Sequence, residues 1–313
     1  MKKPFFSIVV PFYNKEKSLD ICLRSLVAQD FPKDNYEIVA VNNNSTDASY
    51  SIIENYQNIR LIEEKEQGAY AARNTGIRHA QGSFIVFTDA DAQAHPTWLS
   101  SIYRCLIVND YDILIGWYLP ARTIRLLQIH SLLIGKRIKK ALEQGKYSML
   151  TACAANLIIK KEVLEKERLF LMGSISEDAH FVMRCAKKNY RVGFNDAITI
   201  KRHDIAALDI FLLKNLLYGC SNALNKECES PLLVKLRYMS LTLNLALKHF
   251  PAGLGLFLTA TTYLFGYAVT KYRIIPPKNI PILMSKCSQL INRKEKAKLL
   301  SARFFNMSRQ KPT

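Results

Sequence analysis

The regular alternation of strand and helix signals over the first 118 residues restricts the fold more than any other feature of the sequence. Short apolar runs predict buried strands, and amphipathic segments between them predict helices. Strands are expected at residues 6–10, 36–41, 59–62, 84–88 and 112–117, and helices at residues 18–29, 48–56, 69–80 and 96–108. Such alternation predicts an α/β fold, a mostly parallel sheet with helices on both faces. In these sheets, ligands bind at the carboxyl ends of the strands.

The chain after residue 118 continues this pattern less regularly. It predicts a basic amphipathic helix at residues 122–145, a strand at 155–159, a helix at 177–188 and strands near 191–194 and 198–201. From residue 206 onward the pattern is helical, apolar and basic. We therefore expect an α/β domain over residues 1–205, with halves at 1–118 and 119–205, and a C-terminal helical region over 206–313.

The charge of the chain is divided unevenly between these parts. The whole chain has 44 Lys and Arg against 26 Asp and Glu, a net charge of +18. Residues 1–118 carry a net −3, residues 119–205 a net +9, and residues 206–313 a net +12. A basic chain can bind nucleic acid, an anionic membrane or a phosphate-rich substrate. The acidic first third and the lack of a recognised nucleic-acid-binding motif argue against a nucleic-acid partner.

Polar residues follow three of the predicted strands. They are Tyr13-Asn14, the run at residues 42–47, and Asp89-Ala90-Asp91. Two carboxylates separated by one residue after a strand can face the same cavity, where they suit a hard divalent cation shared with a diphosphate. The alternative for Asp89 and Asp91 is a solvated acidic turn.

Several segments of the sequence resemble family-2 glycosyltransferases of the GT-A fold. They are residues 7–14 (SIVVPFYN), 41–47 (VNNNSTD), 68–77 (GAYAARNTGI) and 80–91 (AQGSFIVFTDAD). Residues 155–161 (ANLIIKK) and 177–184 (EDAHFVMR) resemble the acceptor-side strand and the Glu-Asp helix of the family. The resemblance covers about residues 5–205 and implies a Rossmann-like nucleotide-diphospho-sugar transferase fold. Residues 1–118 would be its nucleotide-binding half and residues 119–205 its acceptor half.

On the donor side, the resemblance assigns a role to four residues. Pro11 and Tyr13 match positions that shape the nucleotide pocket, where an aromatic ring lies against the base. The alternative is that Tyr13 is a half-buried residue of a turn at the end of the strand. Asn43 matches a base-contacting position that is often Asp in the family, so the identity of the base stays open. Arg73 lies in a region near the diphosphate, which its guanidinium could pair with, or it is a surface residue of an exposed helix face.

The resemblance also implies a divalent cofactor, Mn²⁺ or Mg²⁺. Asp91 matches the principal metal ligand of the family, and Asp89 matches the carboxylate that contacts the ribose or the water shell of the metal. His203 lies where many members place a third ligand, and Mn²⁺ tolerates imidazole. A structural histidine is the alternative.

Asp178 matches the catalytic base of the family, and Glu177 would hold the acceptor or the helix start. A sugar hydroxyl becomes a good nucleophile as a nearby carboxylate removes its proton. Both acids would also complement the dipole at the start of their helix, a role compatible with catalysis. The implied reaction is an inverting transfer from a nucleotide-sugar donor to a hydroxyl of a glycan or a lipid-linked acceptor. The alternatives are transfer to a polyprenyl phosphate and a catalytically inactive nucleotide-sugar-binding scaffold.

The C-terminal region predicts contact with a membrane. Residues 250–270 are 21 uncharged residues, which is long enough for a membrane span. Residues 271–313 carry a net +10, and a single crossing would export this basic tail against the positive-inside tendency. We therefore expect a hairpin or in-plane helices against an anionic surface, at the cytoplasmic face of the membrane. A buried helical pair that covers the sheet is the alternative.

Overall fold

A computed structural model describes residues 3–121, 135–136, 138–140, 142, 144, 154–167, 170 and 177–203. The chain divides into two units, Met1–Ala206 and Ala207–Thr313, and all the described residues belong to the first. Most of the helix expected at residues 122–145 lies outside the described residues, as does the whole of region 206–313 with its apolar stretch. In the part of the chain that is described, no helix has both the length and the apolar character that crossing a membrane requires.

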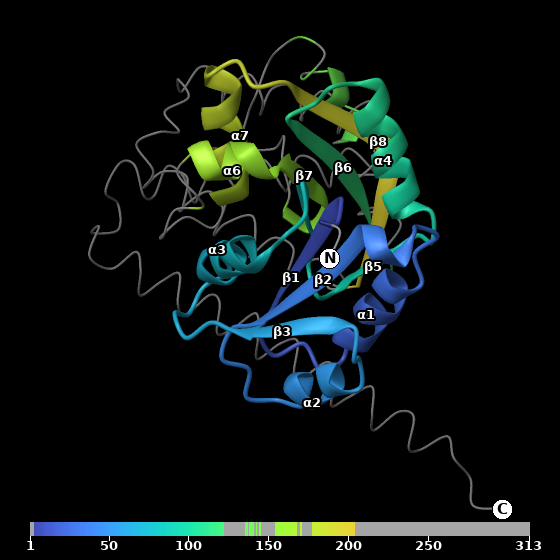
Figure 1. Ribbon diagram of the computed structural model, residues 1–313, viewed down its shortest axis with the longest axis vertical. Coiled ribbons are helices and arrows are strands. Elements are labelled where there is room, and N and C mark those ends of the chain that lie inside the picture. Colours follow the sequence, from blue (N-terminus) through green and yellow to red (C-terminus); the bar gives the residue numbers. More distant parts are fainter. Residues whose placement is uncertain are drawn as a thin grey trace, which may run out of the picture. The chain divides into compact units, whose positions relative to one another are not determined.

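The described residues form one eight-stranded sheet (Figure 1). Its strands, in chain order, are β1 (Phe6–Phe12), β2 (Tyr36–Asn42), β3 (Ile59–Glu63), β4 (Phe84–Phe87), β5 (Ala92–Ala94), β6 (Ile113–Pro120), β7 (Leu157–Lys160) and β8 (Val192–Arg202). The spatial order is β3-β2-β1-β4-β7-β6-β8-β5. The helices are α1 (Leu19–Val27), α2 (Ser49–Glu54), α3 (Ala69–His79), α4 (Trp98–Val108), α6 (Lys161–Lys166) and α7 (Glu177–Lys187), with 3-10 turns at Lys33–Asn35 and Ala154–Asn156.

The direction of the strands decides which side chains meet at one edge of the sheet. Strand β1 is parallel to β2 and β4, and β2 is parallel to β3, as the sequence predicts for the first half of the chain. Strand β7 is antiparallel to both β4 and β6, and β6 is parallel to β8. Strands β4, β6 and β8 therefore point the same way. The carboxyl end of β8 consequently lies at the same edge as the carboxyl ends of β1, β2 and β4.

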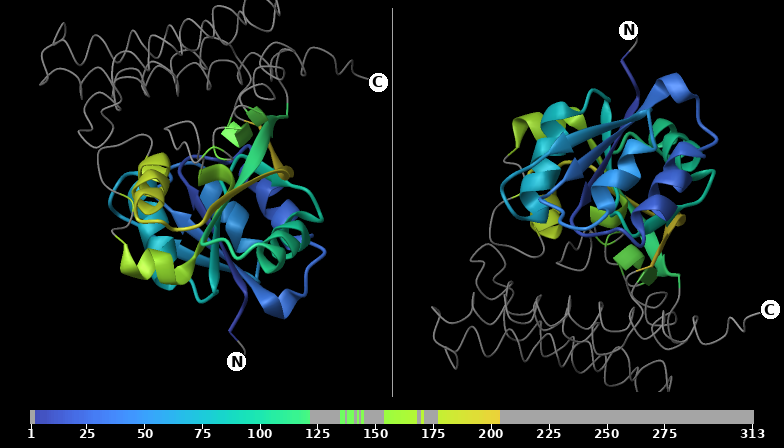
Figure 2. Two further views of the ribbon diagram at one scale, coloured as in Figure 1. Left: turned by 90° about the horizontal axis from the view of Figure 1, so that it is seen from above. Right: turned by 90° about the horizontal axis from the view of Figure 1, so that it is seen from below.

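Helices cover both faces of the sheet, as Figures 1 and 2 show. Apolar side chains of α1, α2 and α4 pack on one face, in a cluster with Ile8 and Val10 of β1. Apolar side chains of α3, α6 and α7 pack on the other face, together with Val9 of β1. Successive residues of β1 thus enter opposite layers, because side chains alternate along a strand.

Three elements differ from the expectation drawn from the sequence. Residues 191–194 and 198–201, expected as two strands, belong to the single strand β8, whose pairing with β6 shifts register between Ile115 and Trp117. Strand β5 and helix α6 were not predicted. They contain three and six residues, and so short a segment shows no hydrophobic period.

A fully buried amide, Asn156, fixes the irregular part of β6 and β8. Its Nδ2 atom donates to the carbonyl oxygens of Trp117 and Ile198, at 2.8 Å each. Its Oδ1 atom accepts from Nε1 of Trp98 at 3.1 Å. A Cβ atom at Gly116 would lie 2.3 Å from Nδ2 of Asn156, so the close approach requires glycine. One side chain therefore holds two strands and α4 together.

We expect Asn156→Ala to lower the free energy of unfolding by about 3 kcal/mol or more, because each buried polar group left unpaired costs about 1–3 kcal/mol. Urea unfolding followed by circular dichroism measures the change. Asn109→Ala is the matched control, because Asn109 is an exposed amide that donates to the carbonyl of Cys105. Equal losses in the two variants would contradict the role of Asn156.

Candidate active site

The loop after β1 is tied to the loop after β2. The backbone N–H of Asn14 donates to Oγ of Ser45 at 3.1 Å, and Oδ1 of Asn14 accepts from the backbone N–H of Thr46 at 2.8 Å. Asn14 has a φ of 51°, which asparagine tolerates better than most residues. Just before this turn, Pro11 is half-buried and the side chain of Tyr13 is 42% exposed. The ring of Tyr13 is thus accessible for the stacking that the resemblance implies.

Asn43 is a buried residue that shapes the following loop. Its Nδ2 atom donates to the carbonyl oxygens of Glu64 and Glu66, at 3.0 and 2.7 Å. Its Oδ1 atom accepts from the backbone N–H of Gly68 at 2.7 Å. Gly68 has a φ of 147°, a conformation that glycine adopts readily. In this arrangement Asn43 positions the segment that leads into α3, and its contact with a base stays a prediction.

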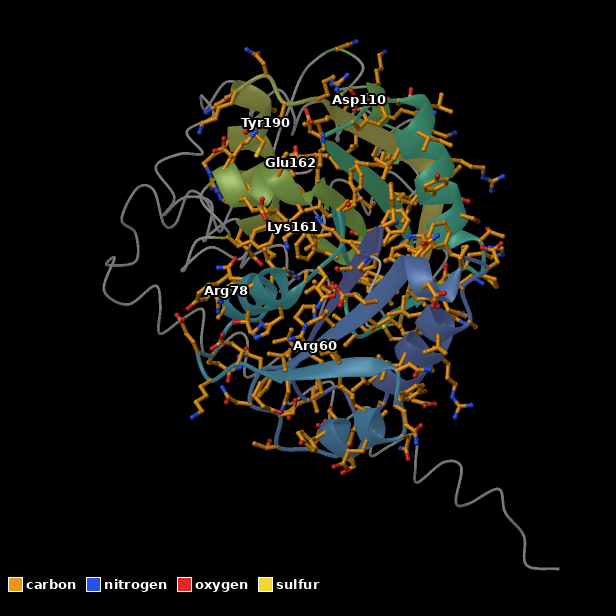
Figure 3. All side chains as sticks on the ribbon, viewed as in Figure 1. Arg60, Arg78, Asp110, Lys161, Glu162 and Tyr190 are labelled. Atoms are coloured by element: carbon orange, nitrogen blue, oxygen red, sulfur yellow. The ribbon has the colours of Figure 1, made fainter. Side chains whose placement is uncertain are left out.

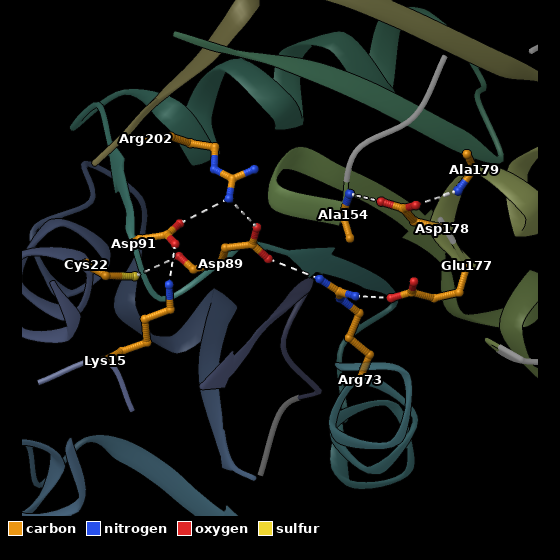
Figure 4. A network of polar contacts seen from close by, with 10 residues as sticks. All are labelled: Lys15, Cys22, Arg73, Asp89, Asp91, Ala154, Glu177, Asp178, Ala179 and Arg202. Atoms are coloured by element: carbon orange, nitrogen blue, oxygen red, sulfur yellow. Dashed lines mark hydrogen bonds and ion pairs between the residues drawn. The ribbon is translucent and has the colours of Figure 1, made fainter. Parts of the chain in front are cut away.

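Asp89 and Asp91 follow β4 and share one basic partner. Nη2 of Arg202, the last residue of β8, lies 3.3 Å from Oδ2 of Asp89 and 3.5 Å from Oδ1 of Asp91 (Figure 4). Nζ of Lys15 lies 2.6 Å from Oδ2 of Asp91, whose side chain is 5% exposed. The two carboxylates therefore face the same point, as the sequence predicts, and they are not a solvated turn.

Arg73 of α3 joins this carboxylate pair to the start of α7. Its Nη2 atom lies 3.1 Å from Oδ1 of Asp89, and its Nη1 atom forms a close ion pair with Oε1 of Glu177 (Figure 4). Arg73 is only 8% exposed, which rules out the alternative of a surface arginine. Burial alone would lower the pKa of Arg73, but the carboxylates of Glu177 and Asp89 raise it above its ordinary value.

Glu177, which is buried, and Asp178, which is half-buried, form an acidic pair at the start of α7. Oδ2 of Asp178 accepts from the backbone N–H of Ala154 at 2.6 Å, and Oδ1 accepts from the backbone N–H of Ala179 at 2.7 Å. Both acids lie in the first turn of α7, the position from which they were expected to complement the helix dipole. Burial raises the pKa of Glu177 to about 7 and also raises the pKa of Asp178, although Arg73 opposes both shifts. A carboxylate with a raised pKa is a better proton acceptor than a free one.

His203 follows Arg202 and lies beside the carboxylates without joining them in a ligand set. Its backbone N–H donates to the carbonyl of Asp91 at 2.9 Å, and Nε2 lies 3.2 Å from Oε1 of Gln93. Within the described residues, no three His, Cys, Asp or Glu side chains are arranged to hold a metal ion. A metal-ligand role for His203 therefore stays a prediction.

The two aspartates nevertheless fit a hard divalent cation. Mg²⁺ and Mn²⁺ prefer oxygen ligands, and Mg²⁺ sites commonly use one or two carboxylates while substrate phosphates and water complete the shell. Asp89 and Asp91 converge on one point, which the cationic Nη2 of Arg202 approaches within 3.5 Å of both. A point that stabilises one cation between two carboxylates is suited to another cation.

Lys15 and Arg202 are the members of this network that sequence analysis missed. Lys15 directly follows the polar pair Tyr13-Asn14, and Arg202 directly precedes His203, so both lie next to predicted site residues. Lys15 reaches Asp91 from the loop after β1. The contact of Arg202 with Asp91 depends on the pairing of β5 with β8, in which Ala92 is opposite Arg202. Such a register joins segments more than one hundred residues apart, and local patterns do not determine it.

The sequence profile of glycosyl transferase family 2 matches residues 7–168, more than half of the chain. Glycosyltransferase AglE of Haloferax volcanii is 29% identical over 201 residues, which are 61% of this chain and 64% of AglE. Poly(ribitol-phosphate) beta-N-acetylglucosaminyltransferase TarS of Staphylococcus aureus is 34% identical over 115 residues, 35% of this chain and 20% of TarS. The matched stretch thus spans less than two thirds of either relative.

Solved structures show the same fold. Residues 1–349 of S. aureus TarS match with a TM-score of 0.51 and 20% identity, over 91% of this chain and 87% of that structure. Mannosyltransferase PcManGT of Pyrobaculum calidifontis, solved with GDP-Man and Mn²⁺, matches with a TM-score of 0.59 and 18% identity, over 99% of this chain and 89% of that structure. The expected GT-A fold and the resemblance to the family are both confirmed.

Proposed function

The chain belongs to glycosyl transferase family 2, and on this premise we propose that it is an inverting, metal-dependent glycosyltransferase with its active site at the strand ends. One observation carries the proposal. Arg73 joins Asp89, on the donor side, to Glu177, which adjoins the proposed base Asp178. The two halves expected to bind donor and acceptor therefore share one network of charges. This continuity argues against an inactive nucleotide-sugar-binding scaffold.

In the proposed reaction, the oxygen of the acceptor hydroxyl attacks the anomeric carbon of the donor sugar, and Asp178 accepts the proton of that hydroxyl. The bond from that carbon to the diphosphate oxygen breaks, and the configuration inverts because attack and departure are in line. Asp89 and Asp91 would hold the divalent cation, and the chemistry that it would supply there is neutralisation of charge on the diphosphate. The backbone N–H groups of Ala154 and Ala179 hold the carboxylate of Asp178 in place.

The proposed donor is a nucleotide sugar, with Pro11 and Tyr13 at the base. The proposed acceptor is a hydroxyl of a glycan or of a lipid-linked intermediate in the synthesis of an envelope glycoconjugate. The named activity of TarS toward poly(ribitol-phosphate) supports an acceptor of this class. GDP-Man and Mn²⁺ in PcManGT support a nucleotide sugar with a divalent cation.

We place the enzyme at the cytoplasmic face of a membrane. The uncharged residues 250–270 and the basic tail that follows them support this location. Each basic residue near an anionic surface contributes about 1 kcal/mol of binding. Salt washing of membranes should leave the protein bound and carbonate extraction should measure how much is inserted. Complete release by salt alone would exclude a hydrophobic hairpin.

A donor panel tests the proposed reaction. Membranes that contain the full chain are incubated with UDP- and GDP-sugars and a lipid extract, with Mn²⁺ or with EDTA, and nucleoside diphosphate release is measured. Asp91→Asn should abolish the release that Mn²⁺ supports. Asp110→Asn is the control, because Asp110 is 76% exposed and pairs with Arg191 at the surface (Figure 3). Equal release by both variants would contradict the proposed site.

The acidic pair at the start of α7 predicts the pH dependence of transfer. Glu177 and Asp178 interact, so they titrate as a pair, and burial raises the pKa of both. The base Asp178 acts in its ionised form and its pKa is raised, so kcat/KM should decrease as the pH falls, with a midpoint above the pKa of a free aspartate. Arg73→Lys keeps a positive charge near the pair, so its profile should decrease in the same range. A profile that stays flat down to pH 5 would contradict the assignment.

A further inference from the structure

Besides Arg73, the carboxylates assigned to the metal already have two basic partners from distant parts of the chain. Arg202 lies within 3.5 Å of both Asp89 and Asp91, and Lys15 lies 2.6 Å from Asp91. These contacts use Oδ2 of Asp89 and both oxygens of Asp91. A divalent cation held by the same two aspartates would need some of these oxygens. Arg202 and the cation therefore compete for one set of acceptors.

Both the backbone and the side chain of Arg202 make contacts that fix its position. Ala92 is opposite Arg202 in the antiparallel pair of β5 and β8, so the arginine is directly across from the residue that follows Asp91. The guanidinium carbon lies 5.4 Å from the ring centre of Tyr118 on β6, within the range of a cation–π contact. The side chain of Arg202 is 15% exposed. This placement is specific, because strand pairing and an aromatic ring both determine it.

The charges of the network suggest what happens when a donor binds. Arg73, the third basic partner, pairs with Glu177 as well as with Asp89. Lys15 and Arg202 bring two further positive charges to the two negative charges of Asp89 and Asp91. A divalent cation brings two positive charges, and the diphosphate of a nucleotide sugar brings two negative ones. The cation can therefore take the carboxylates while the diphosphate takes the basic side chains, and every charge keeps a partner. Arginine is well suited to this exchange because its planar fork pairs equally well with carboxylate and phosphate oxygens.

We propose that Arg202, assisted by Lys15, moves from the aspartates to the donor diphosphate when the metal and the donor bind, and so makes their binding cooperative. This inference rests on the proposed function. Metal alone must displace Arg202 from Asp89 and Asp91 and offers it no new partner, so metal alone binds weakly. Nucleoside diphosphate alone must draw Arg202 away from unneutralised carboxylates. Each ligand therefore strengthens the binding of the other by the same factor, as linkage requires.

The test is Mn²⁺ binding to the purified full chain, measured by electron paramagnetic resonance with and without GDP or UDP. Arg202→Gln should bind Mn²⁺ without nucleotide at least tenfold more tightly than the natural chain. The same variant should bind the nucleoside diphosphate in the presence of Mn²⁺ at least tenfold more weakly. A purely structural role for Arg202 would weaken both affinities together. Opposite changes in one variant are thus specific to the exchange.

Two further variants complete the design. Arg202→Lys keeps the charge and should restore part of the coupling. Lys201→Gln removes an exposed neighbouring charge on the same strand and should leave both affinities unchanged. Circular dichroism in EDTA confirms that each variant is folded. If Mn²⁺ binds the natural chain and Arg202→Gln equally in the absence of nucleotide, Arg202 does not compete with the metal and the proposed exchange is wrong. The proposed metal site at Asp89 and Asp91 is not contradicted by that result. If Mn²⁺ binds neither protein with nucleotide present, the metal-dependent function is itself wrong.

Discussion

Arg73→Met is expected to lower the free energy of unfolding by about 3–5 kcal/mol, because it leaves buried charges without their partner. The side chain of Arg73 pairs with Asp89, which follows β4, and with Glu177 at the start of α7. Without Arg73, burial raises the pKa of Glu177 and Asp178 further, since its positive charge opposes that shift. Transfer should therefore also slow at neutral pH, because a higher pKa leaves less of the proposed base ionised. Urea unfolding and nucleoside diphosphate release measure the two effects.

Two other arginine variants serve as controls for this prediction. Arg73→Lys keeps the charge but loses the fork that reaches two carboxylates at once, so it should fold and retain only part of the activity. Arg78→Met changes an arginine of the same helix that is 58% exposed and pairs with Glu64 (Figure 3). Surface ion pairs contribute about 0–1 kcal/mol, so this control should stay close to the natural chain. An Arg73→Met protein as stable and active as Arg78→Met would contradict the structural role.

Asp178→Asn is expected to lower kcat by roughly 10²–10⁴-fold, the usual contribution of a general base. The substitution keeps the size of the side chain and one acceptor oxygen, but its amide nitrogen cannot accept the second backbone N–H bond. A modest loss of stability should therefore accompany the loss of turnover. The nucleoside diphosphate should still bind, because Lys15, Asp89, Asp91 and Arg202 are unchanged. Transfer within tenfold of the natural rate would exclude Asp178 as the base.

Control measurements separate chemistry from folding in this variant. Asp110→Asn tests the effect of removing an exposed aspartate. Glu177→Gln removes the neighbouring acid and its pairing with Arg73, so it should lower both activity and stability. Asp178→Asn should lower kcat strongly and the free energy of unfolding only slightly. If Asp178→Asn and Glu177→Gln lower kcat equally and also lower the free energy of unfolding equally, the acidic pair has a purely structural role.

Apart from the three-residue strand β5, the strands and helices of the first half could be predicted from sequence because each has its own apolar pattern. The positions of Asp89, Asp91 and Asp178 followed from motifs, and the motifs also gave the family. The partners of Arg73 could not be predicted, since a residue of α3 reaches Glu177 only after the sheet has brought α7 beside it. Nor did the sequence indicate that Asn43 holds the loop at residues 64–68. A polar side chain that binds its own backbone looks the same in sequence as one that awaits a ligand.

The long chain separation between the partners in the network has a consequence for folding. Arg73 and Glu177 are 104 residues apart, and Arg202 and Asp91 are 111 residues apart. Contacts of such long range form late, because the entropy of closing the loop is lost before the contact can stabilise it. During synthesis, the first half of the chain leaves the ribosome well before β8 does. The proposed site is therefore complete only after translation has passed residue 202, when the whole sheet can form.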